Sequence, residues 1–267
     1  MNICVCVKQV PDTTEIKIDP VTNTLIRDGV PSIVNPYDTF ALENAARLKD
    51  RDPETKIVVI SMGPAQAKNA LKECLAIAAD KAYLITDRAF GGSDTLATSY
   101  ILSQAIARVE EKEGKFDCIF CGKQAIDGDT AQVGPEIAEH MGYPQITYAL
   151  ECEADADGLK VIQQGPDYKQ VLKTTLPCVV TFTNPSFDVR YPTIRRKMTA
   201  NRTEIPDVTA VDIPEIDLTC CGLKGSPTRV KKTYVPVRNN QCVLVKEDDL
   251  AASSRKLVAM LSDAHVI

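Results

Sequence analysis

The sequence predicts an α/β fold, with a mostly parallel sheet, helices on both faces, additional antiparallel strands and an extended C-terminal arm. Strand-like and helix-like patterns alternate over the first half of the chain. The strand-like runs are apolar almost throughout, as expected for a sheet that is covered on both faces. Loops containing glycine or proline follow these strands. In such a sheet the crossovers are right-handed, and ligands bind beyond the carboxyl ends of the strands.

The first strand is predicted at residues 3–10, which read ICVCVKQV. Residues 15–30 contain two short alternating segments around a Pro-Val-Thr-Asn turn, and they predict a hairpin excursion from the main fold. Asn35 and Pro36 then predict the start of a helix, with the asparagine side chain as its cap and proline at the first helical position.

Further strand–helix units follow in the same order. Residues 56–63 (KIVVISMG) predict a strand whose helix starts at Pro64, and residues 81–86 (KAYLIT) predict the next strand. The loop FGGSDT precedes a long helix that Asp94, or the serine before it, can cap. Residues 116–122 (FDCIFCG) predict the last strand of this half of the chain.

Parallel strands bring the loops at their carboxyl ends to one rim of the sheet, so several loops should converge there. They are residues 7–11, 61–64, 90–98 and 122–133, with residues 35–38 beside them. Glycine loops that lead into helices attract anions through their backbone N–H groups. We therefore expect a site for a nucleotide-like cofactor; the alternative is a set of ordinary loops with helix caps.

The loop CGKQAIDGDTAQVGP, residues 121–135, has the layout of a phosphate cradle. It is not a P-loop, because Asp129 and Thr130 stand where that motif needs Lys-Ser/Thr. Asp127 and Asp129 repel phosphate, so they should cap helices or accept ribose hydroxyls. Glycines that let the backbone approach a pyrophosphate, and neutral threonine donors, complete the expected site. These are Gly91, Gly92, Gly122, Gly128, Thr95, Thr98 and Thr130.

After about residue 145 the alternation predicts antiparallel strands in QITYALECEADADGLKVIQ and YKQVLKTTLPCVVTFTNP, with Asp157-Gly158 as a hairpin turn. Weak periodicity and recurrent prolines predict a long loop or extended arm at 184–232, and such an arm usually has a partner. Residues 246–261 (KEDDLAASSRKLVAML) predict an amphipathic helix with acids at its start. We divide the chain into a nucleotide-binding α/β domain at 1–183, a docking loop and arm at 184–232, and a C-terminal segment at 233–267.

Composition argues against several classes of function. The net charge of -5 and the pI near 5.2 disfavour nucleic acid as a partner, because its binding needs a basic face. No apolar run reaches the roughly 20 residues of a membrane span, and the N-terminus lacks signal-peptide features. We therefore expect a cytoplasmic protein without membrane insertion.

The sequence predicts neither a metal site nor catalytic side chains. Cys118 and Cys121 should face opposite sides of one strand, which prevents them from holding one metal ion. His140 and His265 lie outside the rim loops, and motifs for nucleophilic or acid–base catalysis are absent. Any chemistry should therefore come from a bound cofactor.

Eight short segments, spread along nearly the whole chain, match those of a known protein family in the same order. They are VKQVPD, NPYDTFALENAARLK, SMGPAQAKNALKECLAIAAD, FGGSDTLATSY, CGKQAIDGDTAQVGP, LPCVVTFTNP, VRYPTIRRKMTA and GSPTRV. Together they resemble the β subunit of electron-transfer flavoproteins. The resemblance implies a Rossmann-like fold of the adenine-nucleotide α-hydrolase-like type. It also implies a heterodimer with an α subunit that carries an electron-transferring FAD, on which residues 233–267 would pack.

In that family the nucleotide pocket of the β subunit holds AMP in housekeeping members. In electron-bifurcating members it holds a second FAD, which accepts hydride from NADH. The resemblance places the adenosine and phosphate contacts, residue by residue, on several rim loops. They fall on Cys6 (through its backbone), Asn35, Asp38, Met62, Gly122, Lys123, Gln124, Ala125, Ile126, Asp127, Gly128, Asp129, Thr130, Ala131, Gln132 and Val133.

The loop FGGSDT favours FAD over AMP. A flavin dinucleotide needs extra room, which Gly91 and Gly92 supply. It also needs extra hydrogen-bond donors at a helix start, and this loop offers several polar residues there, whereas a helix cap alone would need only one. The donors are those of Ser93, Asp94, Thr95 and Thr98. We thus expect a bifurcating subunit. One electron would pass to ferredoxin or flavodoxin, and the other, through the α-subunit FAD, to an acyl-CoA dehydrogenase or related reductase.

The segment DVRYPTIRRKMTANR combines basic and apolar side chains, and the resemblance implies that it docks the partner dehydrogenase. The alternative is a solvated basic loop. The residues concerned are Arg190, Tyr191, Ile194, Arg195, Arg196, Lys197 and Met198.

Two rival functions stay open: a housekeeping β subunit that binds AMP, and a stand-alone ATP-binding regulatory module of the same fold. An NAD-dependent dehydrogenase is disfavoured, because GxGxxG is missing.

Overall fold

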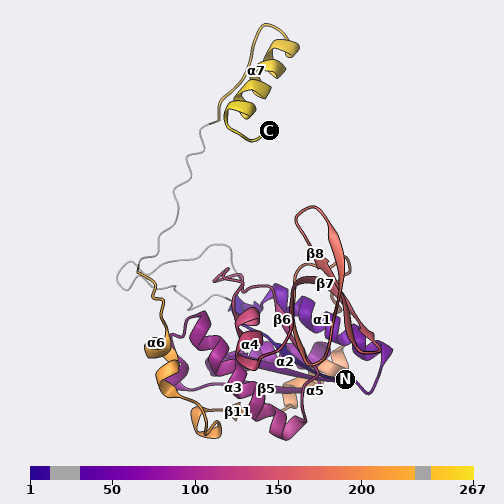
Figure 1. The fold of residues 1–267 in the computed structure, drawn as a ribbon, viewed down its shortest axis with the longest axis vertical. Helices are drawn as coiled ribbons and strands as arrows, with labels where there is room; N and C mark the ends of the chain where they lie inside the picture. The colour runs from indigo at the N-terminus through magenta and orange to yellow at the C-terminus, as the bar shows by residue number, and fades with distance from the viewer. Residues whose placement is uncertain (13–30, 232–241) are drawn as a thin grey trace. The chain divides into compact units, whose positions relative to one another are not determined.

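The computed structural model describes residues 1–12, 31–231 and 242–267. The chain divides into two compact units, Met1–Lys231 and Lys232–Ile267. In the first unit, helices surround a central sheet (Figure 1).

The predicted hairpin excursion at residues 15–30 lies outside the described residues. Two short strands, β2 (Gln9–Pro11) and β3 (Ser32–Val34), flank it in the sequence and pair antiparallel with each other. Together they form a two-stranded ribbon apart from the main sheet.

The main sheet contains nine of the described strands, in the order β11-β5-β4-β1-β6-β10-β7-β8-β9. The strands from β11 to β7 are parallel, and β8 and β9 extend the sheet in antiparallel fashion. Their bounds are β1 (Asn2–Cys6), β4 (Lys56–Met62), β5 (Lys81–Ile85), β6 (Cys118–Gly122), β7 (Gln145–Asp155), β8 (Gly158–Gln164), β9 (Lys169–Thr174), β10 (Cys178–Phe182) and β11 (Asp207–Val208). The predicted fold class is confirmed.

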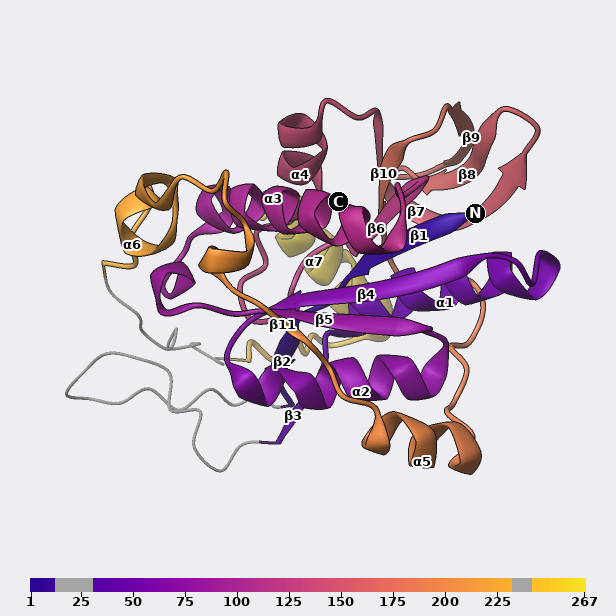
Figure 2. The same cartoon turned by 90° about the horizontal axis from the view of Figure 1, so that it is seen from below.

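Helices cover both faces of this sheet, as predicted (Figure 2). On one face, α1 (Pro36–Arg51) and α2 (Lys68–Ile77) contribute to one apolar core; on the other, α3 (Thr95–Glu113) and α4 (Val133–Met141) contribute to a second. Successive strand residues alternate between the two cores. This alternation explains why the central strands are apolar throughout and not at every second position only.

Two predictions about the later strands are wrong in detail. β10 pairs parallel with β6 and β7, although it was expected to be antiparallel. All five of its residues are buried, which is typical of a strand covered on both faces. In the hairpin between β7 and β8, Asp155 pairs with Gly158, so the turn is Ala156-Asp157, one residue earlier than predicted.

The segment at 184–232, expected to be a loop or extended arm, contains regular structure. It includes α5 (Ile194–Arg202), α6 (Gly222–Gly225) and β11, which pairs with β5 at the edge of the sheet. Only scattered apolar residues in it are buried, among them Ile205 and Val208. Because few apolar residues of this segment are buried, the sequence shows little apolar periodicity there.

In the second unit the predicted helix is present as α7 (Leu250–Asp263). Asp249 caps it by accepting from the Ala252 N–H at 2.6 Å, so an acid does stand at the helix start. Leu250, with Leu257 on the same helix, is exposed. None of the helices in the described ranges combines the length and the apolar character needed to cross a bilayer.

Candidate functional site

A cavity of about 350 Å³ opens at the carboxyl ends of β1, β4 and β6. Here β4 and β6 lie on opposite sides of β1, so the order of the sheet changes direction, and parallel sheets bind ligands at such points. Most of the residues predicted from the sequence line it. They are Cys6, Asp38, Met62, Ser93, Asp94, Thr95, Thr98, Gly122, Lys123, Gln124, Ala125, Gly128, Thr130, Ala131, Gln132 and Val133.

A second cavity, of about 390 Å³, adjoins the first, and Lys8, Met62 and Ser93 line both. The predicted residues that line only the second are Gly91, Gly92 and Asp127. Among the predicted residues that the structure describes, those lining neither cavity are Asn35, Ile126 and Asp129.

Asn35 is fully buried and connects the start of α1 to the loop after β6. Its amide nitrogen donates to the Gln124 carbonyl at 2.8 Å, and its amide oxygen accepts from the Ile126 N–H at 3.1 Å. Asn35 stands at the N-cap position of α1 with Pro36 next, as predicted, but its side chain makes no capping hydrogen bond. A buried amide must satisfy both its donor and its acceptor, and the loop offers partners for both.

Asp38 is a buried carboxylate that accepts three N–H groups. They come from the Lys8 backbone at 2.6 Å, the Asn35 amide at 2.9 Å and the Gly122 backbone at 3.2 Å. Burial raises the pKa of Asp38 to about 7, although these hydrogen bonds act in the opposite direction. A Cβ at Gly122 would lie 2.2 Å from Asp38 Oδ1, so the close approach requires glycine. Asp38 thereby fixes the backbone of two loops that line the cavity.

The two aspartates of the loop after β6 are engaged within the protein. Asp127 pairs with Lys8 at 2.7 Å, and Asp129 accepts from the Gln124 amide at 2.6 Å. The helix α4 has no side-chain cap, so a capping role for either aspartate is wrong. Asp129 and Ala131 have φ of 52° and 55°, in the left-handed region. Non-glycine residues hold that conformation at a cost, and concave backbone of this kind can bind anions.

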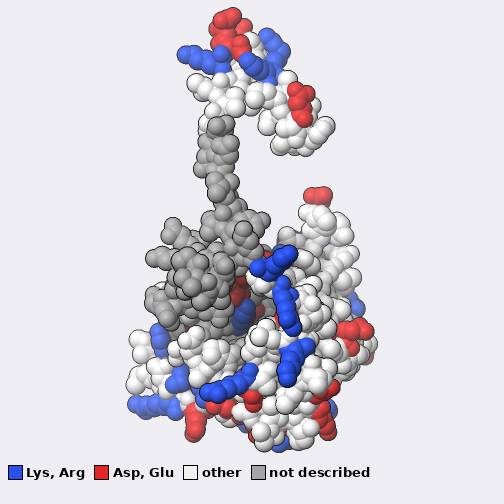
Figure 3. All heavy atoms as spheres, turned by 90° about the vertical axis from the view of Figure 1, so that its left-hand side faces the viewer, with Lys and Arg blue, Asp and Glu red and all other residues white. Residues whose placement is uncertain are grey.

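Two lysines, Lys8 and Lys123, supply positive charge at the cavity. Lys8 is paired with Asp127, whereas Lys123 forms no salt bridge within the described ranges. The Lys123 ammonium lies 5.6 Å from the centre of the Tyr37 ring and 5.1 Å from that of Tyr148. Figure 3 shows the Lys and Arg side chains of one face in separate groups, with Asp and Glu side chains on the same face. An anion in the cavity would thus meet Lys123 without breaking an ion pair.

The loop FGGSDT is held largely by the protein itself. Asp94 caps α3 as predicted, since Oδ1 accepts from a first-turn N–H at 3.1 Å, and Oδ2 accepts from Thr228. The hydroxyl of Ser93 donates to a carbonyl of the same loop at 2.8 Å. Within the part of the chain that the structure describes, the N–H groups of Thr95 and Leu96 have no partner. Backbone groups are therefore freer to meet a ligand here than the side chains of Ser93 and Asp94.

Among the described residues, the cavity is lined by two thiols, those of Cys6 and Cys121. Cys6 and Cys121 are register partners on β1 and β6. A hydrogen bond with Cys6, together with burial, raises the pKa of Cys121, so this thiol stays protonated. Cys118 lies in the opposite core from Cys121, as predicted. No group of three or more His, Cys, Asp or Glu residues in the described ranges could hold a metal ion.

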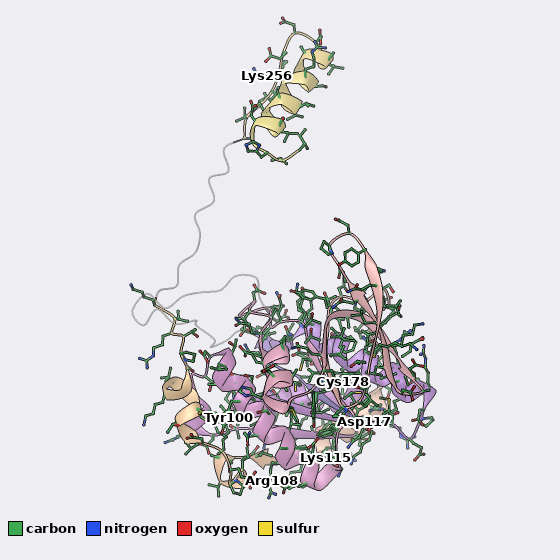
Figure 4. The ribbon with its side chains drawn as sticks, in the orientation of Figure 1. Tyr100, Arg108, Lys115, Asp117, Cys178 and Lys256 are labelled. Atoms are coloured by element: carbon green, nitrogen blue, oxygen red, sulfur yellow. The ribbon has the colours of Figure 1, made fainter. Side chains whose placement is uncertain are left out.

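Charged side chains at the amino ends of the strands pair with one another. Lys115 contacts Glu110 at 2.5 Å, and Asp117 accepts from the Asn2 N–H at 2.7 Å; Figure 4 labels Lys115 and Asp117. Glu113 is also buried there, and hydrogen bonds from lysine and tyrosine side chains lower its pKa to about 2 in spite of its burial. These groups satisfy each other and stabilise the fold.

Two of the predicted docking residues have structural roles. Arg190 donates to Glu43 at 2.8 Å and to Asp50 at 2.7 Å, which fastens the segment after β10 to α1. Arg196 donates to two carbonyls at the end of α2, at 3.1 and 3.3 Å. The side chains of Tyr191 and Ile194 are 91% and 81% exposed. The other predicted docking residues are Arg195, Lys197 and Met198, all exposed on α5.

Comparison with known proteins places the chain among relatives of nearly equal length. The family model described as electron transfer flavoprotein domain matches residues 22–213. Electron transfer flavoprotein subunit beta of Megasphaera elsdenii is 52% identical over 93% of each chain, and that of Clostridium acetobutylicum is 48% identical over the whole of both. The caffeyl-CoA reductase-Etf complex subunit CarD of Acetobacterium woodii is 43% identical, also over both full chains. The chain belongs to the electron transfer flavoprotein β-subunit family.

Proposed function

We propose that this β subunit holds FAD across the two adjoining cavities and takes part in electron bifurcation. NADH would supply a hydride. One electron would pass to ferredoxin or flavodoxin, and the other, through FAD on the α subunit, to an acyl-CoA dehydrogenase or related reductase. The observation that carries the proposal is the second cavity, which meets the first at Lys8, Met62 and Ser93. AMP needs only one cavity, whereas a dinucleotide needs both.

The size and lining of the cavities fit the two ends of FAD. Ligand sites commonly measure about 300–1,000 Å³, and the first cavity alone is near the lower limit. Its polar loop at 122–133 suits adenosine and phosphate. The second cavity is lined by Met62, Ile85 and Phe90, whose apolar surfaces suit a flavin ring.

Lys123 and the start of α3 would hold the phosphates. Lys123 carries a charge that is unpaired among the described residues, and the N–H groups of Thr95 and Leu96 stand at a helix N-terminus. Thr98 and Thr130, which also line the cavity, add neutral hydroxyl donors. Together these groups would bind an anion without placing a carboxylate next to it.

A bound FAD would supply the redox chemistry, because flavins accept hydride and pass electrons onward. The chain's own residues position it and keep water and nucleophiles away. Asp38 is saturated by three N–H donors, so it holds loops in place and is poorly suited to move protons. Cys121 remains a protonated thiol.

The exposed apolar side chains around α5 suit a partner dehydrogenase. Tyr191, Ile194 and Met198 are accompanied by the basic Arg195 and Lys197. Exposed aromatic and aliphatic side chains beside positive charge are typical of interface hot spots and of steering toward an acidic partner. One relative is named as part of a caffeyl-CoA reductase-Etf complex, which supports a reductase of a CoA ester as partner.

The second unit provides a surface for the α subunit. On α7, Leu250, Leu257 and Val258 are 88%, 48% and 54% exposed. Apolar side chains that α7 does not bury within its own unit suit contact with a partner. The α subunit is the partner that the family supplies.

The nucleotide content of the purified heterodimer tests the proposal. The chain is co-expressed with its α subunit, the complex is denatured, and the released nucleotides are quantified. The proposal predicts two FAD and no AMP per heterodimer. One FAD and one AMP would overturn it in favour of a housekeeping carrier, and release of ATP would favour a regulatory module.

Substitution at Ile194 tests the docking surface. Ile194→Glu should lower the rate of electron transfer to the partner enzyme by at least about tenfold, because it removes an apolar anchor and adds the wrong charge. Reduction of the complex by NADH should be unchanged. Val211→Glu, at a position 88% exposed on another segment, is the matched control. Equal effects of the two substitutions would exclude α5 from docking.

A further inference from the structure

The loop at 90–94 is interlocked with a segment more than a hundred positions later in the chain, Gly222–Thr228. The stretch before that segment is fastened to α3, where the Asp217 N–H donates to the Tyr100 hydroxyl at 2.9 Å. Figure 4 labels Tyr100 on α3. The later segment therefore has a fixed support on the helix that the loop introduces.

Polar contacts bind the two segments at three points. The Gly222 N–H donates to Ser93 Oγ at 3.0 Å, and the Asp94 N–H donates to Ser226 Oγ at 2.8 Å. The N–H and the hydroxyl of Thr228 donate to Asp94 Oδ2 at 3.0 and 2.7 Å. Ser226, which is buried, donates its own proton to the Gly222 carbonyl at 2.7 Å. The two segments are thus hydrogen-bonded through both backbone and side chains.

Glycines allow the same two segments to approach closely. Gly92 has φ of 77°, and a Cβ there would lie 2.7 Å from Leu223 Cγ. Gly222 has φ of 60°, and a Cβ there would lie 2.3 Å from the Ala89 carbonyl oxygen. Both the conformation and the space therefore favour glycine on each side of the contact.

We infer that this interlock, the contacts of residues 90–94 with Gly222–Thr228, determines cofactor specificity by holding the second cavity open for the flavin half of a dinucleotide. The inference rests on the proposed FAD site. Phe90 to Ser93 line the second cavity, and Ser93 and Asp94 also line the first. The main polar wall of the first cavity is held separately, by Asn35 and Asp38. Loosening the interlock should weaken FAD binding more than AMP binding, because AMP does not use the second cavity. Ser226 and Thr228 act through the loop, as positioning residues.

The test compares affinities for FAD and AMP in the heterodimer after removal of its nucleotides. The double variant Ser226→Ala/Thr228→Val loses two hydroxyl contacts to the loop, and Thr228→Ser, which keeps its hydroxyl, is the matched control. The inference predicts that FAD affinity falls about tenfold in the double variant, as expected for the loss of about 1.4 kcal/mol. AMP affinity should fall clearly less than FAD affinity, and Thr228→Ser should match the wild type.

Each other outcome has a distinct meaning. A parallel fall in FAD and AMP affinity would show a general structural role and overturn the inference. Unchanged FAD affinity in the double variant would overturn it as well, while FAD binding by the wild type would leave the proposed site intact. A wild-type complex that binds AMP but no FAD would contradict the proposed function and the inference together.

Discussion

The two main walls of the candidate cavity are anchored in different ways. The wall after β6, residues 122–133, is held from the interior by Asn35 and Asp38, which are buried at the start of α1. The loop at 90–94 is held by Gly222–Thr228, in which Gly222 and Ser226 are buried and Thr228 is exposed. A buried hydrogen bond is costly to lose, whereas an exposed one can be replaced by water. The first wall is therefore a fixed part of the fold, and the second is the more adjustable of the two, through the exposed contact of Thr228 with Asp94.

The substitution with the largest expected effect is in the fixed wall. Gly122→Ala should lower the free energy of unfolding by about 3 kcal/mol, because the new Cβ would meet Asp38 Oδ1 and backbone atoms that cannot move aside. Gly128→Ala lies in the same loop and has open space around it, so it should change stability by less than about 0.5 kcal/mol. Chemical denaturation measures both. Equal effects of the two would contradict the tight approach at Gly122.

Asn35→Ala tests the same wall from the side of α1. It leaves the Gln124 carbonyl and the Ile126 N–H without their buried partner, and we expect a loss of roughly 2–3 kcal/mol in unfolding free energy. Asn201→Ala, at an exposed position on α5, should cost less than about 0.5 kcal/mol. A loss for Asn35→Ala no larger than for the control would show that the loop does not depend on this side chain.

Asp38 should make stability depend on pH. Its pKa is raised to about 7 in the fold, so the folded state binds more protons than the unfolded state between about pH 4 and pH 7. The contribution of Asp38 to stability is therefore greatest below that window and is lost as the pH rises through 7. Between pH 5 and pH 8 the loss should be roughly 2 kcal/mol.

Asp38→Asn should remove this slope, as followed by denaturation at a series of pH values. Asp94 provides the contrast within the adjustable wall. Burial acts to raise the pKa of Asp94, but hydrogen bonds from Thr228 and from backbone N–H groups hold this pKa below its usual value. Stability from Asp94 is thus present above its unfolded pKa and lost only in acid. A slope that persists in Asp38→Asn would rule out Asp38 as its source.

Gly92→Ala is expected to have the smallest effect on stability. The left-handed conformation should cost about 1 kcal/mol, while Leu223, which is 61% exposed, can move away from the new methyl group. The substitution should also weaken FAD binding, because Gly92 lines the second cavity. The loss of binding free energy should exceed the loss of unfolding free energy. A loss of stability as large as that of Gly122→Ala would contradict the difference between the two walls.

Local patterns were sufficient where neighbours in the sequence are also neighbours in space. The predicted strand–loop–helix units of the first half are present, except that the first predicted strand, residues 3–10, is divided into β1 and β2, which belong to different sheets. The parallel arrangement brings the loops at 90–98 and 122–133 to one cavity. The cap of α3 by Asp94 could also be predicted, because its partner is three residues away. These features depend on periodicity and on short-range hydrogen bonds.

Long-range polar contacts could not be predicted in the same way. Asn35 stands where the sequence predicts a helix cap, yet the hydrogen-bond partners of its side chain in the loop after β6 are 89 and 91 positions away. The interlock joins residues more than 120 positions apart and leaves no apolar periodicity to detect. The paired roles of Arg190 and Arg196 were missed for the same reason. A residue's type indicates which bonds it can form, and only the fold determines with which partner.

Hydrogen–deuterium exchange on the nucleotide-free heterodimer, with AMP or FAD added back, tests the central claim most directly. The account predicts that AMP slows exchange in the loop at 122–133 and at the start of α3, because both line the first cavity, which AMP occupies. FAD should slow exchange there and also in residues 90–92, which line only the second cavity. If FAD and AMP protect the same residues, the second cavity is not a flavin site and the proposed function is wrong.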